Sequence, residues 1–149
     1  MSERTRILVI DDDETVRESL ATVLQEQGFA VDTAENGKEA IEKSKANVYN
    51  LALIDIRLPD MEGTRLLTEL RETTPKMAKI IITGYPSLEN AVQSVNDGAD
   101  GYVIKPFDID NLLEAIKEQL KKQEEARTYS EEKVKEFVET RAREKGLIS

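Results

Sequence analysis

The sequence contains no cysteine and no histidine. Without cysteine the chain cannot form a disulfide framework, and such a composition suits a reducing compartment, so we expect a cytoplasmic protein. Without histidine it lacks imidazole metal ligands, the Ser-His and Cys-His pairs of nucleophilic enzymes, and any histidine that could carry phosphate. Any chemistry on this chain must therefore use carboxylates, hydroxyls and amines.

Positive charge is also scarce, with 21 Lys and Arg against 30 Asp and Glu and a net charge of −9. This balance argues against direct nucleic acid binding. No apolar run is long enough to cross a bilayer, and the amino terminus does not resemble a signal peptide, so we predict no membrane partner. Residues 1–120 hold 23 acidic and 13 basic side chains, whereas residues 121–149 hold 7 and 8. We therefore divide the chain into a body, residues 1–122, and a charged helical extension, residues 123–149.

Short apolar runs alternate with amphipathic segments along the body. The runs predict strands at residues 6–10, 30–34, 51–55, 79–83 and 101–105, each followed by a helix. Gly28, Pro75 and Gly98 are predicted to end three of the helices. Parallel neighbouring strands need crossover helices, and strands buried on both faces are apolar almost throughout. We expect one doubly wound α/β domain built on a five-stranded parallel sheet.

Polar side chains gather where the predicted strands end. In open parallel sheets, ligands bind outside the carboxyl ends of the strands, near the point where strand order reverses. The strand order 2-1-3-4-5 would place the first and third strands side by side, roughly 5 Å apart. Two carboxylates at those ends could then reach one divalent ion. The strand-end residues are Asp11, Asp12 and Asp13, then Asp55, Thr83 and Lys105.

This set of groups narrows the chemistry of the site. Clustered carboxylates raise one another's pKa unless a cation compensates them, and Mg²⁺ suits a site with few carboxylates and several waters. Lys105 adds a second positive charge and Thr83 a hydroxyl donor. Around a carboxylate nucleophile, Asp55, these groups form a cradle for a phosphoryl group, whose transfer depends on positioning and charge neutralisation.

Four motifs stand in order at consistent spacing: residues 10–13, Asp55 with residues 58–63, residues 83–84, and residues 101–107. Together they resemble the receiver domain of two-component response regulators, over residues 5 to about 122. The chemotaxis regulator of that family is an example of the flavodoxin-like winding, with strand order 2-1-3-4-5. The resemblance therefore implies a flavodoxin-like sheet with five helices, here followed by an extra C-terminal helix.

The resemblance also implies a role for each motif residue at the acidic cluster. Asp55 would accept a phosphoryl group from a phosphohistidine on a separate sensor histidine kinase. Asp12, Asp55 and the main-chain carbonyl of Arg57 would bind Mg²⁺ directly, and Asp11 would act through water. Asp13 is expected to cap the following helix instead. Beyond its own phosphorylation and dephosphorylation, the chain would catalyse nothing.

The remaining motif residues are implied to sense the phosphoryl group. Lys105 and Thr83 would each hold one of its oxygens, and Tyr102 would turn inward when Thr83 moves. The peptide bond from Lys105 to Pro106 is expected to be cis. Arg57 and Tyr85 would tune dephosphorylation. The surface of the fourth helix, fifth strand and fifth helix would then change, and a downstream protein or a second copy of the chain would bind there.

Other functions stay open at this point. A haloacid-dehalogenase-type phosphatase also uses a strand-end aspartate and Mg²⁺, but it needs a second Asp two residues on, where this chain has Arg57. A receiver that only binds partners would not need the full set of groups. The chain could also be a fragment that controls a missing DNA-binding or enzymatic output domain. Asp60 and Glu62 are interpreted as turn chemistry.

The extension carries a narrow apolar stripe of Val134, Phe137 and Val138. Ser130 has the position of an N-cap, and Gly146 that of a helix stop. Continuing the apolar heptad of the body would place polar residues on the seam, so we predict a separate short helix and not one long coiled coil. This helix would be either solvated or docked against the body or a partner.

Overall fold

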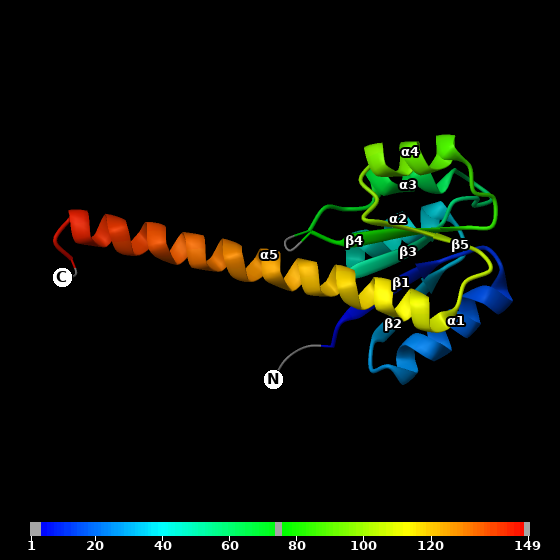
Figure 1. Cartoon of the computed structure of the whole chain (residues 1–149), viewed down its shortest axis with the longest axis horizontal. Coiled ribbons are helices and arrows are strands. Elements are labelled where there is room, and N and C mark those ends of the chain that lie inside the picture. The colour runs from blue at the N-terminus through cyan, green and yellow to red at the C-terminus, as the bar shows by residue number, and fades with distance from the viewer. Residues whose placement is uncertain (1–3, 74–75, 148–149) are drawn as a thin grey trace.

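The computed structural model describes residues 4–73 and 76–147, so the predicted stop at Pro75 lies outside the described residues. Five parallel strands form one sheet in the order β2-β1-β3-β4-β5, as predicted (Figure 1). The strands are β1 (Arg6–Ile10), β2 (Ala30–Ala34), β3 (Leu51–Asp55), β4 (Ala78–Thr83) and β5 (Gly101–Ile104). The helices are α1 (Glu14–Glu26), α2 (Gly37–Ala46), α3 (Gly63–Glu69), α4 (Leu88–Asn96) and α5 (Ile109–Glu144).

Two layers of helices cover the sheet, α2, α3 and α4 on one face and α1 and α5 on the other (Figure 1). Alternate residues of each strand point to opposite faces. Leu8 and Ile10 therefore pack into the core beneath α2 and α3, whereas Ile7 and Val9 pack into the core beneath α1 and α5. Burial on both faces explains why the central strands β1, β3 and β4 are almost entirely apolar, whereas the edge strand β2 is only half-buried and contains Asp32. The two covered faces confirm the doubly wound fold.

The pairing register brings the predicted strand ends to one edge of the sheet. Ile10 of β1 pairs with Ile54 of β3, so Asp11 and Asp55 follow at the same level. Thr83 ends β4 and pairs with Ile104 of β5. This edge, which we call the carboxyl edge, is where β1, β3, β4 and β5 all deliver polar side chains.

Local signals set the helix boundaries much as predicted. The Asp13 carboxylate accepts a hydrogen bond from the Val16 amide, so Asp13 is the N-cap of α1. Gly28 and Gly98 follow α1 and α4 with φ values of 94° and 100°, a left-handed conformation that only glycine adopts without strain. α3 ends at Glu69, well before Pro75.

The prediction of a separate helix beginning at Ser130 is wrong. α5 runs without a break for 36 residues, about 54 Å at 1.5 Å per residue, and extends away from the body (Figure 1). Residues 121–144 contain no Gly or Pro, and Arg127 pairs with Glu124 and with Glu131, the latter at 2.7 Å. Helix-forming residues and pairs spaced by three or four stabilise the helix where it leaves the body, beyond the contacts of Gln123 with Asn50 and Lys76.

The apolar pattern thus predicted the part of α5 that packs on the body, but not that the same helix continues beyond it. The predicted stop at Gly146 is confirmed: its φ is 71°, and the Leu147 amide donates to the Ala142 carbonyl. The boundary predicted between residues 122 and 123 falls inside this helix. Within the described residues, no helix is both long and apolar enough to span a membrane.

Candidate functional site

Three carboxylates meet at the carboxyl edge. Asp11, Asp12 and Asp55 each offer an oxygen, and these oxygens lie within 4.8 Å of one another. Asp11 and Asp55 are buried, only 3% and 9% exposed, whereas Asp12 faces solvent. A site with a few carboxylate oxygens and access to solvent suits Mg²⁺, because this ion keeps several of its bound waters. The donor set therefore fits the expected magnesium ion.

Lys105 supplies the positive charge beside these acids. Its Nζ lies 3.0 Å from Asp11 Oδ2 and 3.6 Å from Asp55 Oδ2. Burial alone would lower the pKa of Lys105, but the carboxylates of Asp11 and Asp55 outweigh burial and raise that pKa above its usual value. The ammonium group therefore stays charged in the site. The peptide bond between Lys105 and Pro106 is cis, as predicted.

The carboxylate of Asp55 is held in an unfavourable environment. Burial, and next the charge of Asp11, raise the pKa of Asp55 to about 6, against the opposing effects of the Arg57 amide and Lys105. The Arg57 amide donates to Asp55 Oδ1 at 3.2 Å. Because burial and the neighbouring carboxylate disfavour the ionised form of Asp55, a cation that compensates these charges will bind favourably here.

Thr83 and Tyr102 lie on the two strands beyond Asp55. Thr83 is fully buried, and its Oγ1 accepts a hydrogen bond from the Tyr85 amide at 2.9 Å. Tyr102 pairs with Ile81 in the sheet, and its ring packs against the core beneath α2 and α3. The Tyr102 hydroxyl is buried and has no hydrogen-bond partner among the described residues. The tyrosine is therefore turned inward.

Arg57 and Tyr85 contact each other across the mouth of the site. The Arg57 guanidinium carbon lies 3.9 Å from the centroid of the Tyr85 ring, within the range of a cation–π interaction. Arg57 belongs to the loop after β3 and Tyr85 to the loop after β4. The stack joins these two exposed loops next to Asp55. Sequence reasoning named both positions but did not predict their contact.

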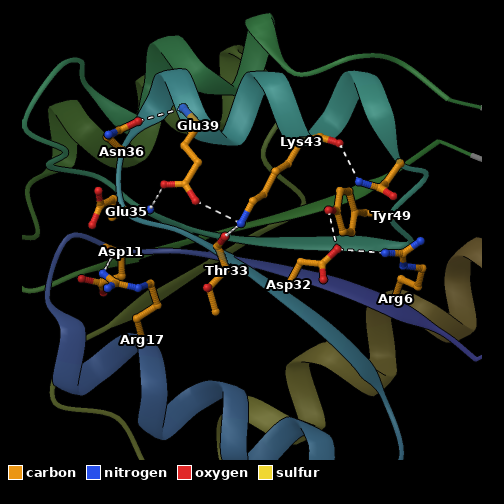
Figure 2. Close-up of polar contacts among 11 residues, drawn as sticks. Arg6, Asp11, Arg17, Asp32, Thr33, Glu35, Asn36, Glu39, Lys43 and Tyr49 are labelled. Carbon is orange, nitrogen blue, oxygen red and sulfur yellow. Dashed lines mark hydrogen bonds and ion pairs between the residues drawn. The ribbon is translucent and has the colours of Figure 1, made fainter.

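Two supporting residues were missed or undervalued from the sequence. Arg17 on α1 donates from Nη1 to the Asp11 carbonyl at 2.8 Å, and Figure 2 shows it beside Asp11. Asp60, interpreted as turn chemistry, accepts from the amides of Gly37 and Lys38 at the start of α2. Each of these bonds uses a backbone group of one partner, and those of Asp60 also join segments more than 20 residues apart, so no side-chain pattern reveals them.

The side of the sheet near β2 carries polar contacts of another kind (Figure 2). Tyr49 donates to Asp32 at 2.6 Å, and Arg6 donates to the same carboxylate oxygen at 2.9 Å. Burial, together with the Asp32 charge, raises the pKa of Tyr49, so its phenol stays protonated. These groups satisfy one another, and they join β1, β2 and the segment before β3.

Comparison with known proteins agrees with this geometry. The family model for the response regulator receiver domain matches residues 7–117. A CheY-like receiver domain structure from Methanospirillum hungatei is 46% identical, covers 83% of this chain and 99% of its own, and superimposes with a TM-score of 0.80. The response regulator TrrA from Thermotoga maritima, solved in complex with Mg²⁺-BeF, is 38% identical and has a TM-score of 0.69. The match covers 77% of this chain and 98% of TrrA.

Among curated proteins, the regulatory protein AtoC of Escherichia coli is 39% identical over 112 residues, 75% of this chain but 24% of AtoC. The chain thus spans about a quarter of the length of that relative. The matched residues contain the acidic cluster, Thr83 and Lys105. The fold, the strand-end groups and these matches agree: the chain belongs to the receiver domain family of two-component response regulators.

Proposed function

We propose that Asp55 accepts a phosphoryl group from a phosphohistidine on a separate sensor histidine kinase. One observation carries this proposal: a buried carboxylate stands among two further acids and one ammonium group at the ligand-binding edge of the sheet. In the transfer, an Asp55 oxygen forms a bond to phosphorus while the bond from phosphorus to the donor nitrogen breaks. The chain would catalyse only this step and the later hydrolysis.

The neighbouring residues would neutralise the charge that the phosphoryl group brings. Asp12, Asp55 and the Arg57 carbonyl would bind Mg²⁺ directly, with Asp11 acting through water. The ion would supply positive charge for the transferring oxygens. The Mg²⁺-BeF complex of TrrA supports magnesium in this family. Lys105, already 3.6 Å from Asp55, would turn from its carboxylate partners to a phosphoryl oxygen.

Thr83 and Tyr102 would carry the signal away from Asp55. The Thr83 hydroxyl would donate to a phosphoryl oxygen, which alters its present bond with the Tyr85 amide and shifts the loop after β4. The sequence predicted that Tyr102 turns inward when Thr83 moves; because its hydroxyl is already buried, the new packing of that loop would instead hold the ring where it is. A partner that binds this arrangement more tightly receives the signal.

The partner surface would be the face of α4, β5 and α5. The apolar face of α4 points to solvent, since Leu88, Val92 and Val95 are 81%, 50% and 69% exposed, while Ser94 is buried. Ile104 of β5 is 49% exposed beside it. Exposed apolar surface of this kind marks a protein interaction site. A downstream protein, or a second copy in a homodimer, would bind there.

The body, residues 1–122, would act as the receiver, and residues 123–149 would form the charged extension. The output could be a protein bound by this chain, or a DNA-binding or enzymatic domain that follows it in a longer protein. We expect the receiver itself not to bind nucleic acid.

Incubation with acetyl phosphate and Mg²⁺ tests the acceptor. We expect a Mg²⁺-dependent, acid-stable and base-labile label on the wild type, and none on Asp55→Asn. Equal labelling of that variant would remove Asp55 from its role.

A further inference from the structure

The loop between β3 and α3 is a narrow hairpin whose base lies against Asp55. Arg57 and Glu62 form an antiparallel bridge across it, and the Arg57 amide donates to Asp55 Oδ1. At the same base, where the hairpin leads into α3, Gly63 approaches the strand closely, because a Cβ there would lie 2.4 Å from the Asp55 carbonyl oxygen. The hairpin therefore sets where the Arg57 backbone stands relative to the acceptor.

The tip of this hairpin is bonded to a different part of the molecule. Asp60 Oδ1 accepts from the Gly37 amide at 2.8 Å, and Asp60 Oδ2 accepts from the Lys38 amide at 2.9 Å. These are the first two amides of α2, and the third, that of Glu39, donates to Asn36. The two bonds lower the pKa of Asp60, as expected when amides stabilise a carboxylate.

Packing reinforces the same junction. A Cβ on Gly37 would lie 2.4 Å from Met61 Sδ, so the tip sits directly on the start of α2. Met61 also packs against the core beneath α2 and α3. α2 is itself fixed to β2, because Lys43 donates to the Thr33 carbonyl and pairs with Glu39 (Figure 2). The hairpin tip thus rests on a support joined to the sheet.

We propose that Asp60 is a positioning residue for the magnesium site. By bonding the hairpin tip to α2, it holds the Arg57 backbone beside Asp55 before the ion arrives. Binding then needs less ordering of the loop, and the affinity for Mg²⁺ rises. The inference rests on the proposed function, since it concerns the same site. Residues that hold a metal ligand in place without contacting the metal typically change the affinity for the metal by about 10- to 100-fold.

Titration calorimetry with Mg²⁺ on the full chain compares Asp60→Ala with Asn36→Ala. Both variants remove a side-chain acceptor from the start of α2 and should lower the melting temperature, Asp60→Ala by more because it removes two bonds to a carboxylate and Asn36→Ala removes one. We expect about tenfold weaker Mg²⁺ binding for Asp60→Ala alone, and partial recovery in Asp60→Asn, which keeps one acceptor oxygen. Unchanged affinity in Asp60→Ala, or an equal loss in Asn36→Ala, would overturn the proposal.

Gly37→Ala provides a second variant that keeps the Asp60 carboxylate. Its added methyl group should push Met61 away from α2 and weaken Mg²⁺ binding. Wild-type affinity in a folded Gly37→Ala would contradict the inference.

Acetyl phosphate labelling distinguishes a failure of the proposed function from a failure of the role of Asp60. If the wild type neither binds Mg²⁺ nor takes label, both fall. If it does both and Asp60→Ala behaves identically, only the role of Asp60 falls.

Discussion

The two edges of the sheet treat polar groups in opposite ways. At the amino edge, where the strands begin, polar groups meet complementary ones: Gln123 of α5 donates to the carbonyls of Asn50 and Lys76, at 2.8 Å and 2.7 Å. The Asn50 side chain accepts from the Arg6 amide at 2.9 Å. These bonds connect α5 with the segments before β3 and β4, and the segment before β3 with the start of β1.

At the carboxyl edge the same fold brings like charges together. Asp11 and Asp55 are buried close to each other with one ammonium group between them. Such an arrangement costs folding free energy, and a ligand that compensates it recovers that free energy as affinity. The contrast teaches that the amino edge serves stability and the carboxyl edge serves binding.

Removing the ammonium group should have the largest effect on the carboxyl edge. In Lys105→Met the incoming phosphoryl oxygens lose their charged partner, and we expect the rate of labelling by acetyl phosphate to fall about 100-fold or more. Lys79→Met is the matched control. Lys79 is also buried, at 5% exposure, but its Nζ donates to the Leu67 carbonyl of α3. This variant should change stability and keep the labelling rate per folded molecule; a comparable loss of rate would refute the assignment.

The cost of crowding should appear in the pH dependence of stability. The pKa of Asp55 is raised from 3.8 to about 6, so the native chain binds a proton that the unfolded chain releases between these values. The stability that protonated Asp55 provides is therefore fully present below pH 4 and is lost as the pH rises through 6. Without Mg²⁺, the stability of Asp55→Asn relative to the wild type should therefore rise by about 3 kcal/mol between pH 4 and pH 8.

Urea unfolding at each pH measures this difference. Gln123→Ala is the control from the amino edge: it loses three neutral hydrogen bonds, one of them long at 3.5 Å, and should lower the free energy of unfolding by about 2 kcal/mol at both pH values. A stability difference between Asp55→Asn and wild type that does not change with pH would show that Asp55 is not destabilised by crowding.

The contrast between the edges also explains how far the sequence could be interpreted. Apolar runs predicted all five strands, and the strand-end positions of Asp12, Asp55 and Lys105 predicted the carboxyl edge, because burial and parallel topology leave a clear pattern. The roles of Gln123 and Asp60 could not be predicted, since each bonds backbone groups of a distant segment. Continuity of α5 past Ser130 was missed because charged pairs, and not apolar spacing, stabilise that part.

The smallest expected effect compares two tyrosine hydroxyls. That of Tyr49, near the amino edge, donates to Asp32 at 2.6 Å, whereas that of Tyr102 is buried without a partner among the described residues. A buried hydroxyl without a hydrogen bond costs free energy, so Tyr102→Phe should leave stability unchanged or raise it by up to about 1 kcal/mol. Tyr49→Phe should lower it by about 1 kcal/mol, because Asp32 loses a donor. Urea unfolding of both variants decides the matter: destabilisation by Tyr102→Phe would mean that its hydroxyl has a partner in solution, and the inward ring would then be held by a bond instead of by packing alone.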